Sequence, residues 1–313
     1  LQIARAYITS KAWEPLGIES PENCEDIEQK VEQKVKGSRR ADERTKEIAL
    51  DVAKRPEVLD QLLTDLFSVG AGRGWSFGRG LAAGAESLTD MWERLVEAFG
   101  KSSECERNNI QAIRGFLNKA AELDPQTVGV LLDGALQHPI LAPLFVLLQT
   151  SIDIDERAAQ RLEEALDLGW TPAWTYKELT IGRATDRIPP TILRRLILKM
   201  AALPDGLQVA VDVFAMRLYL ARTDGRPIDH ALVEIGREIL SGYNFSRRDY
   251  EVDFDLGEIF LACFQGVEAF EPARSFIRRL CTALLDHQVY PSSFSHLLSC
   301  VFRTQPMVAL DEF

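Results

Sequence analysis

The sequence lacks any long uncharged apolar run. No stretch approaches the ~20 consecutive apolar residues that a membrane-spanning helix needs, and no secretory signal peptide is visible at Leu1. Strand-like alternation of useful length is missing too. The nearest case, Tyr250–Phe254, alternates with acids and is expected to be a loop. These absences exclude membrane insertion and a large sheet, so we expect a soluble, cytoplasmic, all-α protein without significant β-sheet.

Residue types that carry catalysis are scarce. The chain has only 4 histidines, all in or beside predicted helices, which leaves little for general acid–base chemistry. Its 5 cysteines include no close C-x2-C element. A zinc set can be imagined from Cys281, His287, His296 and Cys300, but three of these fall on apolar helix faces, which favours a core role. We therefore expect reduced thiols, no metal, no cofactor and no catalytic residues.

Two ligand-loop patterns are incomplete. Gly100–Ser102 resembles the end of a Walker A loop, but Leu95 stands where that motif requires glycine, and the preceding segment is helical. A run of acids resembles the start of a calcium loop, but Phe254 occupies the place of the turn glycine. These acids form a solvated loop or contact a basic partner: Asp249, Glu251, Asp253 and Asp255.

The net charge of −11 argues against a dedicated nucleic-acid surface, because phosphate neutralisation requires clustered lysine and arginine. Apolar residues make up 46% and charged residues 27%, as in ordinary folded proteins. A chain of 313 residues exceeds the usual single core, so we expect several domains or an elongated array.

Two helices around a tight turn, within 189–222, show the expected organisation best. Pro189 and Pro190 suit a helix start, and the Pro-Asp-Gly at 204–206 is a stop. The first helix carries one apolar face, whereas the second, 207–221, is apolar almost throughout. A half-solvated helix followed by a buried one is typical of stacked helical hairpins. The apolar face consists of Ile192, Leu193, Leu196, Ile197 and Met200.

From Glu106 onward the same rhythm continues. Helices are expected at 107–123, 126–137, 140–151, 156–168, 172–182, 191–203, 207–221, 229–240, 255–264, 272–286 and 292–302. Their starts are spaced by roughly 15–20 residues, so one hairpin takes about 35–40, a period that fits α-solenoid repeats. The spacing predicts an array like HEAT or tetratricopeptide repeats, although no strict repeat signature is present.

Three stretches are expected. Residues 1–69 form polar helices leading into the array, with a break at Gly37-Ser38. Residues 70–105 contain a glycine-rich connection and a helix for which Ser87 is the N-cap and Asp90 the N3 residue. Residues 106–313 form the array. The chain starts without methionine and stops inside an amphipathic segment, so we expect a fragment truncated at both ends.

The glycine-rich stretch, 70–84, is too rich in glycine to be regular helix throughout. A phosphate-cradling loop would follow a strand, whereas a helix precedes this stretch. We expect a flexible connection between helices with close backbone packing.

Exposed aromatics and paired arginines are the candidates for partner binding. One aromatic group surrounds Gly169 and Pro172; it either packs between hairpins or supplies hot spots for a partner. Basic pairs recur at 39–40, 194–195, 247–248 and 278–279, and could hold an acidic protein or nucleic acid if several lined one face. The candidate partner-binding residues are Trp170, Trp174, Tyr176, Arg194, Arg195, Arg247, Arg248, Asp249, Glu251 and Asp253.

Several short segments resemble the C-terminal helical arms of large bacterial signal-transduction NTPases with numerous domains (STAND-type), including antiphage defence proteins. They are 77–82 (FGRGLA), 88–95 with Trp92, 115–117 (GFL), 179–183, 204–206 (PDG) and 216–218 (MRL). The resemblance covers the chain from about Phe77 to its end and marks repeat packing. It implies an arm that recognises a ligand, often a foreign protein, for an NTPase domain upstream. No functional residue of the family is carried over.

The sequence thus predicts a non-catalytic sensor module that binds a protein ligand through an extended helical surface. A structural scaffold or assembly subunit is the alternative, and a helical enzyme or a nucleic-acid-binding array comes after it. A sensor should show clustered exposed aromatics or one sign of charge, and a scaffold an apolar patch. An enzyme should show a pocket with perturbed titratable groups. The oligomeric state is not predicted.

Overall fold

The computed structural model describes residues 1–9, 27–102, 109–245 and 252–313, and only the backbone of 27–34. Every regular element within these residues is a helix, and none is a strand, which confirms the all-α prediction. Contacts divide the chain into two compact units, Leu1–Ile152 and Asp153–Phe313. The changes of composition near residues 69 and 105 both lie inside the first unit.

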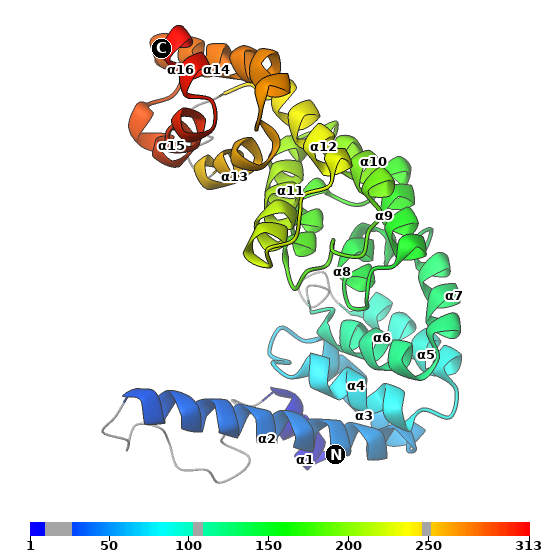
Figure 1. Ribbon diagram of the computed structural model, residues 1–313. Helices are drawn as coiled ribbons and strands as arrows, with labels where there is room; N and C mark the ends of the chain where they lie inside the picture. The colour runs from blue at the N-terminus through cyan, green and yellow to red at the C-terminus, as the bar shows by residue number, and fades with distance from the viewer. Residues whose placement is uncertain (10–26, 103–108, 246–251) are drawn as a thin grey trace. The chain divides into compact units, whose positions relative to one another are not determined.

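The first unit consists of two rows of helices (Figure 1). In one row α2, α4, α6 and α8 pack on each other in turn, and in the other α1, α3, α5 and α7 do so. The elements are α1 (Gln2–Thr9), α2 (Ile27–Ala53), α3 (Pro56–Phe67), α4 (Gly74–Gly84), α5 (Leu88–Lys101), α6 (Gln111–Leu123), α7 (Pro125–Ala135), the 3₁₀ turn η4 (Ala142–Leu144) and α8 (Phe145–Gln149).

The second unit repeats this plan. One row runs α9, α10, α12, α14, α16, and the other η5, α11, α13, α15. The elements are α9 (Glu156–Leu168), the 3₁₀ helix η5 (Ala173–Thr180), α10 (Pro190–Ala201), α11 (Gly206–Thr223), α12 (His230–Ser241), α13 (Asp253–Cys263), η7 (Val267–Ala269), α14 (Phe270–Leu285), η8 (Pro291–Ser293), α15 (Ser295–Thr304) and α16 (Pro306–Glu312). Such packing between chain neighbours is what stacked hairpins produce within a unit; a solenoid spanning the whole chain stays a prediction.

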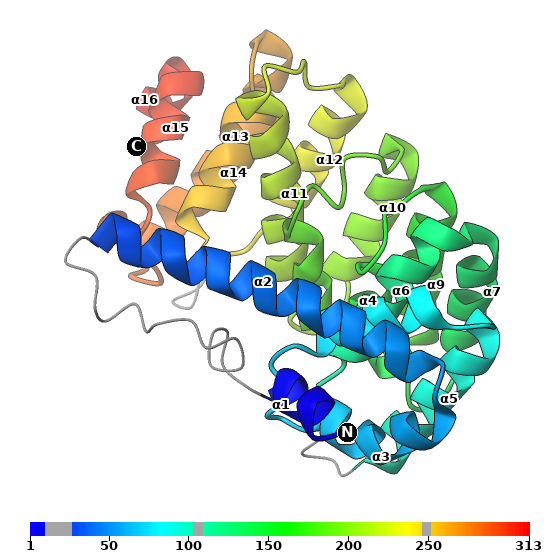
Figure 2. The same cartoon turned by 90° about the horizontal axis from the view of Figure 1, so that it is seen from below.

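The predicted break at Gly37-Ser38 is wrong, because α2 runs through it without interruption (Figure 2). Gly37 is buried and stands four residues before the buried Ala41, on the same face as Thr45. The close approach of α4 falls further along α2, where Gly80 faces Lys46 and Ala49, and Gly84 faces Leu50 and Ala53. A glycine inside a helix lowers its stability by about 1 kcal/mol, and the packing offsets this.

Within the glycine-rich stretch, Gly74–Gly84 forms α4, so the expectation of a flexible connection is wrong there, whereas 70–73 forms turns and the stretch is, as expected, not helical throughout. Close backbone packing, expected for the same stretch, is present. A Cβ atom on Gly78 would lie 1.9 Å from the carbonyl oxygen of Ala112 in α6, and one on Gly80 would lie 2.3 Å from that of Lys46 in α2. The glycines of α4 therefore allow two neighbouring helices to approach its backbone on two sides.

The helix pair α10–α11 follows its sequence pattern. All five residues of the predicted apolar face are buried, and α11 is buried along most of its length. The turn differs in one detail: the left-handed residue is Asp205, with φ of 56°, not Gly206. Gly206 is required for space instead, since a Cβ there would lie 1.9 Å from the carbonyl oxygen of Met200.

Candidate functional site

Two tryptophans are exposed where α9 is followed by η5: Trp170 lies on the segment that joins them, and Trp174 is the second residue of η5. Trp170 is 52% exposed and Trp174 62%, whereas tryptophan side chains are on average highly buried. The segment leaves α9 through Gly169, whose φ of 69° is the left-handed conformation that glycine adopts without strain. Pro172 then fixes the backbone at a φ of −63° just before η5. Both tryptophans are therefore held on a conformationally restricted segment.

Tyr176, predicted in the same aromatic group, is fully buried, so its assignment to a binding surface is wrong. Its hydroxyl donates a hydrogen bond of 2.9 Å to the carbonyl oxygen of Leu162 in α9, and burial raises the pKa of the phenol. The apolar ring lies in the core and the hydroxyl finds a backbone partner, as buried tyrosines usually do. Tyr176 fastens η5 to α9 and thereby positions Trp174.

Arg194 and Arg195 project from α10 to its two neighbours in the row. Arg194 forms an ion pair of 2.8 Å with Glu238 of α12. Arg195 makes a bidentate pair with Glu163 of α9, with both contacts at 3.0 Å. Hydrogen bonding to Glu163 raises the pKa of Arg195, and the same contact lowers the pKa of Glu163. These arginines connect helices, so they do not form a patch of uncompensated charge.

The acidic and basic candidates around residue 250 divide into two groups. Arg247, Arg248, Asp249 and Glu251 lie outside the described residues. The Asp253 carboxylate accepts hydrogen bonds from the backbone N–H groups at the start of α15, those of His296 (3.0 Å) and Leu297 (2.8 Å). It therefore acts as a cap supplied from another helix, and its oxygens are already engaged.

A pair of carboxyl groups connects α11 and α13, and it was not singled out from the sequence. Burial and, to a smaller extent, the nearby Asp212 carboxyl together raise the pKa of Asp255 to about 7. Lys177 of η5 lies 2.9 Å from Asp212 and acts in the opposite direction. The available signal was Asp212 itself, the only acid in α11.

Glu258, His296 and Cys300 meet between α13 and α15, but not as a catalytic triad. The Glu258 carboxylate, only 3% exposed, lies 2.5 Å from Arg222 and 3.4 Å from Nε2 of His296. Cys300 Sγ approaches the same nitrogen, at 3.6 Å. In a triad the carboxylate orients the histidine through its other nitrogen. Burial also raises the pKa of the Cys300 thiol, which disfavours the nucleophilic thiolate.

The imagined zinc residues do not converge. No group of three or more His, Cys, Asp or Glu side chains within the described ranges could hold a metal ion. The described cysteines, Cys263, Cys281 and Cys300, are free thiols, and burial raises the pKa of Cys263 to about 12. His287 is exposed just after the end of α14.

Three rings form a partly exposed ladder across α11, α13 and α15. Phe254, 48% exposed, stacks on His296 with 4.9 Å between ring centroids. Its other neighbour is Tyr219, 36% exposed, at 5.9 Å in an edge-to-face arrangement. The ladder is a second exposed aromatic feature of this unit.

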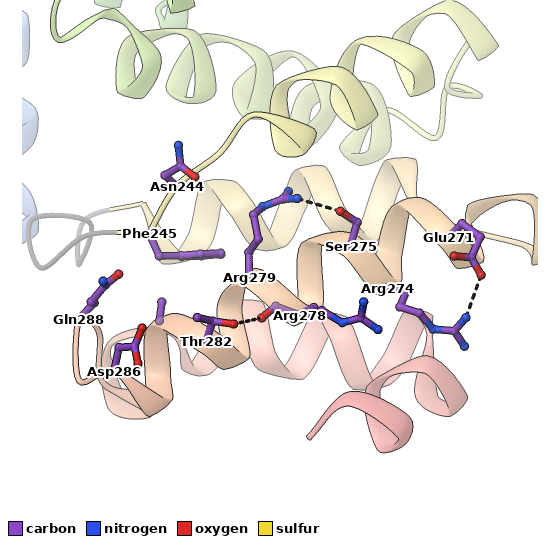
Figure 3. A pocket seen from close by; sticks show the side chains of 11 residues that line it. Asn244, Phe245, Glu271, Arg274, Ser275, Arg278, Arg279, Thr282, Asp286 and Gln288 are labelled. Carbon is purple, nitrogen blue, oxygen red and sulfur yellow. Dashed lines mark hydrogen bonds and ion pairs between the residues drawn. The ribbon is translucent and has the colours of Figure 1, made fainter.

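A cavity of about 470 Å³ lies along α14 and the segment that follows α12 (Figure 3). Arginines dominate its lining. Arg274 pairs with Glu271 at 2.8 Å, and Arg278 pairs with Glu312 of α16 at 2.8 Å. Arg279 donates instead to neutral oxygens, among them the carbonyl of Leu240 at 2.6 Å. The cavity therefore has two arginines paired with carboxylates and one without such a partner.

None of the helices in the described part of the chain combines the length and apolar character required to cross a bilayer. No protein-family model matches the chain, and no curated protein or solved structure matches it either. The argument for a function therefore depends on the geometry of the chain's own residues.

Proposed function

We propose that this chain is a non-catalytic recognition module that binds a protein ligand, with Trp170 and Trp174 as its anchors. The observation that carries the proposal is the exposure of both rings on a segment fixed by Gly169, Pro172 and Tyr176. Tryptophan is enriched among the residues that dominate binding energy in protein interfaces. A rigid support lowers the conformational entropy lost on binding.

The exposed area of the two tryptophan rings is large enough to supply much of the binding energy of a protein complex. At these exposures roughly 100–150 Å² of each ring stays in water, since a tryptophan buries up to ~250 Å². At about 25 cal/mol per Å², covering one ring contributes roughly 3 kcal/mol before the costs of association. Two such anchors can supply much of the energy of a micromolar complex, which needs about 8 kcal/mol.

Further parts of the proposal rest on the sequence. By its resemblance to the helical arms of STAND-type NTPases, the module is the sensor arm of such an NTPase in a bacterial cytoplasm. Its ligand is a foreign protein, such as a phage product. Neighbour-to-neighbour packing in each unit supports a helical-repeat surface for such a ligand. The arrangement of Glu258, His296 and Cys300 gives no support to a hydrolytic enzyme.

A second candidate, a structural scaffold, is favoured by one observation. On α15 and α16, four large apolar side chains are 41–68% exposed, and two of the rings stack at 5.5 Å. Contiguous apolar surface is typical of permanent interfaces. These residues are Phe302, Met307, Leu310 and Phe313.

Site-specific crosslinking separates the two. A photoreactive phenylalanine analogue is placed at Ile181, which follows η5 and is 63% exposed, so that both tryptophans are kept, or at Val267, a matched position of the same unit that is 76% exposed. Both proteins are illuminated with extracts of infected and uninfected bacteria. We expect a defined adduct at 181 that is absent at 267 and is lost when Trp170→Ala and Trp174→Ala are added. The same adducts at both positions, or an adduct at 181 that persists without the tryptophans, would contradict recognition through the tryptophans.

A further inference from the structure

We propose that the cavity along α14 binds a small molecule whose anionic group, a phosphate or a carboxylate, is held by Arg279. This site is independent of the tryptophan surface. It uses a basic pair noticed in the sequence, Arg278-Arg279, for which the recognition function provides no role.

Within the described residues, Arg279 has no carboxylate partner. Its guanidinium donates to the carbonyl oxygens of Leu240 (2.6 Å) and Tyr243 (3.3 Å) and to the hydroxyl of Ser275 (2.9 Å). All three acceptors are neutral. Burial lowers the pKa of Arg279, because no charged group nearby compensates for the loss of water. Its sequence neighbour Arg278, by contrast, has the carboxylate of Glu312.

The guanidinium also has donors to spare. It carries five N–H groups, and the three hydrogen bonds engage one each on Nε, Nη1 and Nη2. One N–H on each terminal nitrogen is left. A planar pair of such donors matches a carboxylate or phosphate, which binds arginine in bidentate fashion.

A purely structural role for Arg279 explains only some of its N–H groups. Arg279 binds carbonyls at the C-terminal end of α12, where a cation is favoured by the partial negative charge of about half a unit. That contact accounts for two of the three bonds. It leaves one N–H on each terminal nitrogen without an acceptor among the described residues, where the only further contact of the guanidinium is the Phe276 ring, 5.9 Å away at its centroid.

The cavity has the size and lining of a small-molecule site (Figure 3). Its volume of about 470 Å³ falls in the ~300–1,000 Å³ range of ligand pockets. Phe245, only 7% exposed, supplies an aromatic surface, and Asn244 and Thr282 supply polar groups. Two acids share the lining: Glu271, which is paired with Arg274, and Asp286, which is exposed to solvent. We therefore expect a ligand that joins one anionic group to a ring.

The test measures binding of phenyl phosphate, benzoate and inorganic phosphate by titration calorimetry at constant ionic strength. Phenyl phosphate is expected to bind the wild-type chain at least as tightly as inorganic phosphate, because its ring adds contacts with the cavity lining. Benzoate separates carboxylate from phosphate selectivity. Absence of binding for all three probes would overturn the proposal.

Two substitutions locate the site. Asn244→Asp places a carboxylate in the cavity, at an exposed position where folding tolerates it, and should weaken phenyl phosphate binding at least tenfold. Arg187→Gln removes one cation elsewhere in the same unit, on a side chain that is 73% exposed, and should change binding less than twofold. Equal weakening by both variants would indicate unspecific attraction and overturn the proposal. Arg279→Gln should abolish binding; if it unfolds the chain, Asn244→Asp still decides.

Discussion

The carboxyl groups of Asp255 on α13 and Asp212 on α11 are hydrogen-bonded to each other. Such a bond requires a proton on one of the two groups, because two carboxylates offer only acceptors. Burial and the neighbouring acid together raise the pKa of Asp255 to about 7. The Asp212–Asp255 carboxyl pair between these two helices therefore holds a proton at mildly acidic pH and loses it near neutrality.

This relationship predicts a pH dependence of stability. In the unfolded chain Asp255 has a pKa of about 3.9, so between about pH 4 and 7 the native state holds a proton that the unfolded state lacks. The contribution of Asp255 to the free energy of unfolding is fully present below about pH 4. It declines as the pH rises to about 7, by at most ~1.4 kcal/mol per pH unit. Urea unfolding between pH 5 and 8 measures this slope.

Asp255→Asn should remove most of the slope and make the chain more stable than wild type above pH 7, by about 1–3 kcal/mol. Asp224→Asn is the control. The pKa of Asp224 is lowered by Arg183, so its contribution changes only at more acidic pH and the slope between pH 5 and 8 should persist. An unchanged slope in Asp255→Asn would show that Asp255 does not hold the proton.

A second prediction concerns the close contact between α4 and α6. Gly78→Ala would bring its methyl group within 1.9 Å of the Ala112 carbonyl oxygen, so α6 has to move. We expect a loss of about 2–4 kcal/mol in unfolding free energy, the upper range for overpacked positions. Gly134→Ala, in a helix with nothing within 4 Å of the new atom, should instead stabilise by about 0.5–1 kcal/mol. Chemical denaturation measures the unfolding free energy of both variants. A similar change in the two would refute the packing role of Gly78.

A third prediction assigns Asp253 to folding. Asp253→Ala removes the acceptor for two N–H groups at the start of α15 and should destabilise by about 1–2 kcal/mol. Asp253→Asn keeps a side-chain oxygen and should recover at least half of the loss. Hydrogen exchange should show faster exchange in α15 for the alanine variant only. Equal effects of both substitutions would mean that charge, not capping, matters there.

The sequence predicted those features that depend on local pattern. The apolar face of α10 is buried as its spacing indicated, since 3.6-residue periodicity reports the side that neighbours cover. Ser87 caps α5 and accepts from the N–H of Asp90 at 3.2 Å, because capping involves residues only three apart. Of the helices expected, 172–182 forms a 3₁₀ helix instead, and 140–151 forms the 3₁₀ turn η4 followed by the short helix α8.

Features set by distant residues were missed. Glycine has a low intrinsic helix propensity, and nothing local in 70–84 shows that α2 and α6 would cover α4 closely enough to outweigh it. Tyr176 and Trp174 are both aromatic and two residues apart, so the pattern did not show which is buried. Asp255 was predicted as a solvated acid because its partner, Asp212, lies far away in the chain.

The central claim is that Trp170 and Trp174 anchor a protein ligand. Once crosslinking has identified that ligand, its dissociation constant is measured by calorimetry for Trp174→Ala, Trp170→Ala and the control Val267→Ala. Truncating a hot spot costs at least about 2 kcal/mol, so we expect each tryptophan variant to bind at least ~30-fold more weakly, with unfolding free energies within about 1 kcal/mol of wild type. The control should bind as wild type does. Wild-type affinity in both tryptophan variants would contradict the account.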